Sequence, residues 1–196
     1  MKWLGCLGVL VVVALIVGGV VIGGYNSLVG LSQGTDAQWA QVENQYQRRA
    51  DLIPNLVETV KGFAAQERTV LEEVTKARAS VAGIKATPEL INDPAAFQKF
   101  QRAQQELGGA LSRLLVTVER YPDLKSNANF LTLQSQLEGT ENRITVERQR
   151  FNEAVRDYDT RLKLFPASLV ASSRGFKAKA FFEAAPGGEQ APKVKF

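Results

Sequence analysis

The residues best placed to do chemistry in this sequence are charges at positions that should be buried. Two long stretches repeat apolar residues every three and four positions, and each repeat is interrupted near its middle by charged side chains. A buried charge is tolerated when it is paired, and in coiled coils such pairs set the register. We therefore predict an internal ionic layer of six residues: Arg48, Arg49, Asp51, Glu67, Glu141 and Arg148. Binding of an anionic ligand by the same cluster is the functional alternative.

Catalytic chemistry has little support, because the chain contains no histidine. Ser-His-Asp and Cys-His catalysis and histidine-ligated metals are thereby excluded. Glutamates could in principle bind two metals, as in carboxylate-bridged bundles, but that chemistry uses Glu-x-x-His pairs. The candidates for it would be Glu67, Glu72, Glu73 and Glu141. We predict no catalytic, cofactor-binding or metal-binding residue and no cofactor.

The single cysteine, Cys6, lies inside an apolar N-terminal run, so an intramolecular disulfide cannot form. Lipid attachment would need the cysteine after a hydrophobic signal stretch, whereas here the stretch follows it. The formal charge of +4 comes from basic residues interleaved with acidic ones. This pattern argues against nucleic acid as a partner.

Membrane insertion is predicted by the segment from Trp3 to Gly24, which has no charged side chain. Its 22 residues give a helix of roughly 33 Å, enough to cross a bilayer core of about 30 Å. We expect a flank at 1–2 and a retained transmembrane helix at 3–24, because no A-x-A-like cleavage site follows. Lys2 is the only basic side chain before Arg48, so the positive-inside rule puts the N-terminus in the cytoplasm and the remainder outside.

Residues 25–165 have helical periodicity and predict an all-α, antiparallel, coiled-coil-like bundle. The first helix is expected over about 27–82. Its seam consists of the series Val42, Arg49, Leu56, Phe63, Val70 and Ala77 and the series Trp39, Tyr46, Ile53, Val60, Glu67, Val74 and Val81. Pro54 falls inside this helix. Either the helix kinks there, or it stops and a new one begins with Asp51 as N-cap.

Two further helices are expected at about 94–121, with Asp93 as N-cap and Pro94 in the first turn, and at 127–164. The seam of the last helix is Phe130, Leu137, Ile144, Phe151, Tyr158 and Phe165. Periodicity ends there, so the tail at 166–196 is predicted to be partly disordered. Phe176, Phe181 and Phe182 could pack on the bundle. The basic residues of the tail could bind a membrane surface: Lys177, Lys179, Lys193 and Lys195.

Several motifs carry a resemblance to a known family. The most specific is RRADLIPNLV at 48–57, and others are Ala77-Arg78-Ala79, YPDLK at 121–125 and LEGTENRI at 137–144. In these blocks the chain resembles the LemA family. The resemblance implies a bacterial membrane protein with a single N-terminal span, an antiparallel helical bundle and no enzymatic activity.

The predicted function is that of an interaction or scaffold protein of the bacterial cell envelope, held in the inner membrane by one span. Its expected partners are the lipid bilayer and a membrane protein or a second copy of the chain. A regulatory subunit of an envelope protease or transporter is the alternative, and a carboxylate-based metalloenzyme is the more distant one.

Overall fold

The computed structural model describes the backbone of residues 2–183, which form helices and connecting turns without a strand. This confirms the predicted all-α fold class. The elements, in chain order, are α1 (Lys2–Phe63), α2 (Arg68–Ala82), the 3-10 helix η1 (Pro88–Asn92), α3 (Pro94–Val118), α4 (Pro122–Lys125), α5 (Ala128–Lys163) and α6 (Ala167–Arg174).

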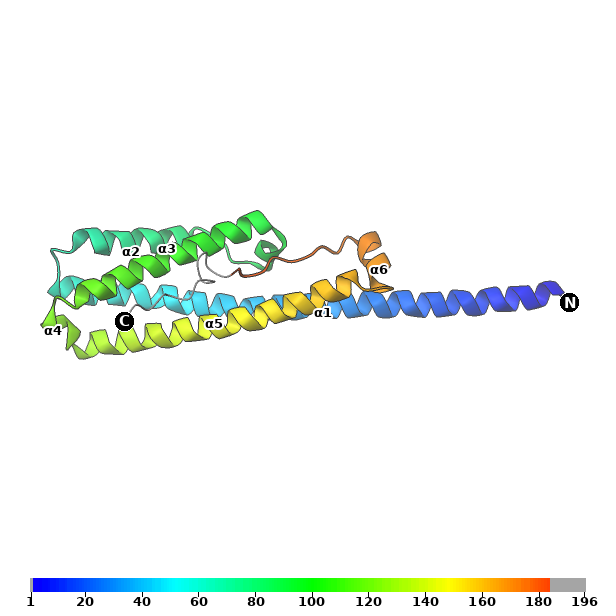
Figure 1. Cartoon of the computed structure of the whole chain (residues 1–196), viewed down its shortest axis with the longest axis horizontal. Helices are drawn as coiled ribbons and strands as arrows, with labels where there is room; N and C mark the ends of the chain where they lie inside the picture. The colour runs from blue at the N-terminus through cyan, green and yellow to red at the C-terminus, as the bar shows by residue number, and fades with distance from the viewer. Residues whose placement is uncertain (1, 184–196) are drawn as a thin grey trace, which may run out of the picture.

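Helix α1 projects far beyond the rest of the molecule at its N-terminal end (Figure 1). Among the described residues it is the one helix that is long and apolar enough to cross a membrane. Its side chains from Leu7 to Ile22 are exposed apart from the half-buried Gly18, and burial begins at Gly24 and Leu28. The change in environment along one helix therefore falls at the end of the apolar run. The side chain of Cys6 lies outside the described residues.

Pro54 neither ends α1 nor starts a new helix, because α1 continues to Phe63. Proline cannot donate to the carbonyl of Ala50, one turn earlier. That carbonyl instead accepts a hydrogen bond of 3.0 Å from Nε of Arg78, a residue of α2. Asp51 is exposed and accepts from Gln47, so it does not cap a helix.

The helix predicted over 27–82, with a kink or break near Pro54, is instead interrupted ten residues later, because a turn separates Phe63 from Arg68. Gly62 lowers helix propensity just before this turn. Val74 and Val81 beyond it still point into the core, while Phe63 is 44% exposed. The heptad series keeps its phase across the turn, which is why periodicity alone did not reveal it.

The helices pack as antiparallel pairs, α1 against α5 and α2 against α3, to form an elongated bundle (Figure 1). On α1 the core residues follow a heptad from Trp39 to Val60. As predicted, Asp93 caps α3, accepting from the backbone N–H groups of Ala95 and Ala96 at 2.9 and 3.1 Å. The seam of α5 stops before Phe165, which is 78% exposed because α5 ends at Lys163.

Trp39 lies at the centre of an aromatic cluster and is fully buried. Its ring lies 5.5–6.0 Å from four phenylalanine rings, those of Phe97, Phe100, Phe151 and Phe182. Its Nε1 donates to the carbonyl of Ala86 at 2.8 Å. Helices α1, α3 and α5 and the C-terminal segment therefore share one core.

The tail predicted to be partly disordered from residue 166 is ordered through Glu183, where the description ends. After α6 the chain returns along the bundle in extended form. Asn152 binds the backbone of Phe182 through both side-chain atoms, at 2.9 Å each. Lys179 is buried and paired with Asp36 at 2.5 Å, so it is not available for a membrane surface. Lys193 and Lys195 lie outside the described residues.

Candidate functional site

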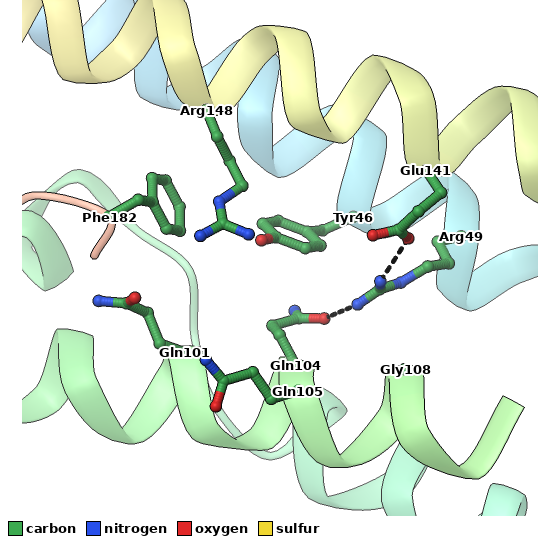
Figure 2. A pocket seen from close by; sticks show the side chains of 9 residues that line it. All are labelled: Tyr46, Arg49, Gln101, Gln104, Gln105, Gly108, Glu141, Arg148 and Phe182. Carbon is green, nitrogen blue, oxygen red and sulfur yellow. Dashed lines mark hydrogen bonds and ion pairs between the residues drawn. The ribbon is translucent and has the colours of Figure 1, made fainter. Parts of the chain in front are cut away.

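A small polar cavity of about 130 Å³ lies where α1, α3, α5 and the C-terminal segment meet (Figure 2). α1 and α3 each present a polar residue at a seam position, and the segment after α6 closes one side. Its lining residues are Tyr46, Arg49, Gln101, Gln104, Gln105, Gly108, Glu141, Arg148 and Phe182.

Arg49 is the central residue of this cavity and is only 4% exposed. Its guanidinium donates to Glu141 of α5 at 2.8 Å and to the side-chain oxygen of Gln104 of α3 (Figure 2). The Glu141 side chain is 55% exposed, so the ion pair reaches from the core to the solvent. Arg49 thereby links three helices through one planar group.

Two aromatic rings face the cations of the cavity. The guanidinium carbon of Arg49 lies 5.1 Å from the centre of the Tyr46 ring, and that of Arg148 lies 4.4 Å from the Phe182 ring. Such contacts stabilise a cation where water is partly excluded. Burial raises the pKa of the Tyr46 hydroxyl above its ordinary value of 10.0, so this hydroxyl is neutral at physiological pH.

Two buried donors beside the cavity lack hydrogen-bond partners among the described residues. They are Nε of Arg49 and the side-chain nitrogen of Gln104. Two guanidinium groups face one carboxylate, which leaves an excess of positive charge. Chemically, the cavity can hold water or a small group that carries oxygen acceptors.

The structure brings together only part of the predicted ionic layer. Arg49 and Glu141 are paired, and Arg148 lines the same cavity. Arg48 and Asp51 are exposed on α1 and do not line it. Arg48 precedes Arg49 by one residue, and Asp51 follows it by two. At these spacings on a helix, their side chains point away from the face that packs on α5.

Glu67 is also separate from the cavity. It lies at the turn before α2, where it accepts from Arg120 at 3.0 Å and from the hydroxyl of Tyr121 at 2.6 Å. This contact raises the pKa of the Tyr121 hydroxyl, because the hydrogen bond favours its neutral form. The heptad repeat predicts Glu67 in the layer only because the repeat keeps its phase through this turn.

The four glutamates considered as metal ligands are dispersed. Glu73 pairs with Arg113 at 3.0 Å, Glu67 with Arg120 and Glu141 with Arg49, while Glu72 lines a groove between α1 and α2. Within residues 2–183 no group of three or more acidic or cysteine side chains is placed to hold a metal ion.

Sequence reasoning missed Gln104, Tyr46 and Phe182 as members of this site. Gln104 had a visible signal, since it is the polar residue in the series Phe97, Phe100, Gln104, Leu107, Leu111, Leu114 and Val118. Phe182 had none, because it follows the last helix and belongs to no periodic pattern. The position of Phe182 depends on the hydrogen bonds between its backbone and Asn152.

The sequence model of the LemA family matches residues 38–196, which include every residue of the cavity. The chain belongs to the LemA family. This confirms the resemblance read from the RRADLIPNLV block. In this chain the RRADLIPNLV block contains Arg49, which lines the cavity. It also contains Pro54 and the Ala50 carbonyl, which accepts the hydrogen bond from Arg78 of α2.

Named relatives of this LemA chain are magnetosome proteins. It is 28% identical over 181 residues to MamQ 1 and MamQ 2 of Paramagnetospirillum magneticum AMB-1 and to MamQ of Magnetospirillum gryphiswaldense MSR-1. The similar region covers 84% of this chain and 66% of each relative, so the chain spans just under two thirds of their length.

Proposed function

We propose that this LemA-family chain is a non-enzymatic, membrane-anchored scaffold of the bacterial cell envelope. Its helical bundle would bind a membrane protein or a second copy of the chain. The observation that carries the proposal is the continuity of α1, a single helix from the apolar run into the bundle core. A scaffold needs a surface held at a defined place, and a continuous helix provides that.

The continuity of α1 determines how far the bundle extends. From residue 24 to residue 63 the helix is about 60 Å long at roughly 1.5 Å per residue. Its residues from Leu28 onward are packed against α5, which stiffens them. If the apolar run crosses the bilayer, the bundle stands away from the membrane instead of swinging on a flexible linker.

A non-enzymatic role is supported by how the charged groups are used. Arg49 and Arg113 each form an ion pair between helices with a glutamate, and Arg120 pairs with Glu67 between the turns after α3 and before α2. These carboxylates stabilise helix packing and do not converge on a common reacting centre. The relatives are named for the magnetosome and not for a reaction.

The proposed location is the inner membrane, with the bundle outside the cytoplasm. Its support is Lys2, the one basic side chain before Arg48. Protease added to intact spheroplasts should then digest the bundle. A bundle that stays protected until the membrane is broken would reverse the orientation.

The scaffold proposal is tested by photo-crosslinking the full chain in its native membrane. A crosslinking amino acid is placed at exposed apolar positions of the bundle, namely Val116, Leu131 and Val146, which are 70%, 49% and 46% exposed. Discrete crosslinked products identified by mass spectrometry are expected from at least one position. Recovery of monomer alone from all three would refute the proposal.

The same experiment addresses the alternative of a regulatory subunit. If the crosslinked partner is an envelope protease or a transporter, its activity can be compared with and without this chain. A change in that activity would favour regulation over a purely structural role. An unchanged activity with an intact complex would favour the scaffold.

The excess of positive charge at the cavity favours a second candidate function, retention of a small anion. Phosphate or acetate would be attracted by the guanidinium groups of Arg49 and Arg148, which line the cavity beside the one carboxylate of Glu141. A rise in melting temperature with phosphate over equal ionic strength of chloride, absent in Arg148→Gln, is expected. Equal melting temperatures in both salts would show that the cavity does not bind phosphate and would refute this second function.

A further inference from the structure

Helix α6 lies against α1 where the apolar run of α1 ends, at the end of the bundle from which α1 projects (Figure 1). A Cβ atom built on Gly24 would lie 3.6 Å from Cγ2 of Val170 and 3.7 Å from Cα of Ala167. The ring of Tyr25 lies 5.9 Å from that of Phe176, just beyond α6. These contacts place α6 at the boundary between the span and the bundle.

Only one face of α6 is used for this packing. Ala167, Val170 and Ala171, spaced as one helical stripe, are at most 5% exposed. The remaining apolar side chains of α6 and of the turn before it are uncovered. These are Leu164, Phe165 and Leu169, which are 51%, 78% and 63% exposed.

The polar groups of α6 are largely satisfied within the helix. The hydroxyls of Ser172 and Ser173 donate to the carbonyls of Leu169 and Val170, at 3.0 Å each. At the C-terminal end Gly175 is left-handed, with φ of 75°, and the following N–H bonds back to Ala171 at 3.1 Å. A helix closed in this way loses few hydrogen bonds when water is removed from its surface.

Basic side chains surround the same region. Lys163, Arg174 and Lys177 are exposed, and the guanidinium carbon of Arg174 lies 5.6 Å from the centre of the Tyr25 ring. Tyrosine and basic residues are typical of the headgroup level of a membrane, where anionic lipids attract cations.

We propose that α6 and the Leu164–Phe165 turn insert into the interface of the bilayer that α1 crosses. The buried face of α6 packs on Gly24, two residues beyond Ile22, where the run of exposed aliphatic side chains of α1 ends. Lipid is the partner that this proximity indicates, because a membrane that covers the apolar run of α1 would lie beside the exposed apolar side chains of α6. The inference rests on the proposed anchor and adds a second contact with the same membrane.

A second contact has a mechanical consequence. One helix crossing a bilayer leaves the bundle free to tilt in any direction. Insertion of α6 on one side of α1 would oppose a tilt that lifts α6 from the bilayer surface, because that tilt would pull Phe165 and Leu169 into water. The membrane would then restrict the direction in which the bundle can lean.

The test measures the depth of spin labels on the full chain in vesicles of phosphatidylethanolamine and phosphatidylglycerol. In a Cys6→Ser background, a nitroxide is attached through Leu169→Cys, with Phe165→Cys as a second position. Val116→Cys on α3 is the matched control, since Val116 is 70% exposed and distant from the span. Val11→Cys reports on the span itself. Circular dichroism verifies that each variant is folded.

At Leu169 and Phe165 we expect relaxation by oxygen to exceed relaxation by a water-soluble nickel complex, at a depth within about 10 Å of the headgroups. At Val116 nickel should dominate. Strong relaxation by nickel at Leu169, with Val11 in lipid, would refute insertion of α6 while leaving the anchor intact. Weak relaxation by both reagents would indicate a protein contact and would also overturn the proposal. A water-exposed Val11 would instead overturn the anchor.

Discussion

Replacing Arg78 of α2 by methionine should destabilise the bundle, because it removes the hydrogen-bond donor to the Ala50 carbonyl of α1. Pro54 leaves the carbonyl of Ala50 without its intrahelical donor, and Nε of Arg78 donates to it at 3.0 Å. Methionine keeps much of the aliphatic stem but has no donor. The loss is therefore concentrated in one hydrogen bond between α2 and α1.

The size of the effect follows from the chemistry of that bond. A hydrogen bond from a charged donor contributes about 1.5–3 kcal/mol, and a buried carbonyl left alone costs about 1–3 kcal/mol. Arg78 is only half-buried, so water can reach part of the site after the substitution. We expect Arg78→Met to cost about 1–2 kcal/mol, which for a domain of this size lowers the melting temperature by roughly 2–8 °C.

The proline provides a direct check on the cause. In a Pro54→Ala background the backbone N–H of residue 54 can donate to the Ala50 carbonyl again, so the carbonyl no longer depends on Arg78. There the same Arg78→Met change should cost less than about 0.5 kcal/mol. The coupling between the two sites is then about 1 kcal/mol, well above the deviation expected for independent sites.

The assay is urea unfolding of the full chain in detergent micelles, followed by circular dichroism. Arg102→Met is the matched control, because Arg102 is exposed on α3, and it should change stability by less than about 0.5 kcal/mol. If Arg78→Met costs the same with proline or alanine at position 54, the carbonyl is not what Arg78 stabilises. Arg78 would then not be the group that compensates for the missing donor of Pro54 in the unbroken helix.

Three further changes test other parts of the structure in the same assay. Trp39→Ala should cost about 3–5 kcal/mol, because it opens a cavity among four phenylalanine rings and leaves the Ala86 carbonyl without its donor; a cost under about 1 kcal/mol would contradict the packing described. Asp93→Ala removes the N-cap of α3 and should cost about 1 kcal/mol, and full retention of stability would show that the cap is dispensable. Burial raises the pKa of Asp159 above its ordinary value of 3.8, against the opposing hydrogen bond from the Lys179 N–H. The folded state therefore binds this proton more tightly, and the contribution of Asp159 to stability falls as pH rises from about 4 through its raised pKa. Relative to the natural chain, Asp159→Asn should accordingly gain stability between pH 4 and pH 7, and a gap that stays constant or narrows would refute the assignment.

Much of the fold could be predicted from the sequence because helices carry their own periodicity. The buried positions of α1 from Trp39 to Val60 are those that the three-and-four spacing indicates. In α3 the spacing identifies one buried stripe from Phe97 to Val118, and the structure buries a second one at Ala103, Ala110 and Thr117. The cap at Asp93 and the extent of the apolar run are also local properties. They depend on residues within a few positions of each other, so no knowledge of the fold was required.

For the cavity, the sequence could indicate only which charged residues occupy positions of the apolar repeat. Charge in an apolar seam identified Arg49, Glu141 and Arg148, which the structure brings to one cavity. The same rule wrongly included Glu67, because a heptad count does not register a turn that preserves the phase. Arg48 and Asp51 were also predicted in the layer because they are close to Arg49 in sequence. They lie on the exposed side of α1, whereas Arg49 is buried.

What the sequence determined by itself is a long apolar helix, amphipathic helices with defined buried faces, and the scarcity of catalytic residue types. Only the tertiary structure decided that Arg78 completes the helix around Pro54, that Lys179 meets Asp36, and that Phe182 enters the aromatic core. The physical reason is the range of the interactions. Periodicity reports which side of a helix avoids water, whereas a hydrogen bond or ring contact between distant segments depends on positions that only the packed chain defines.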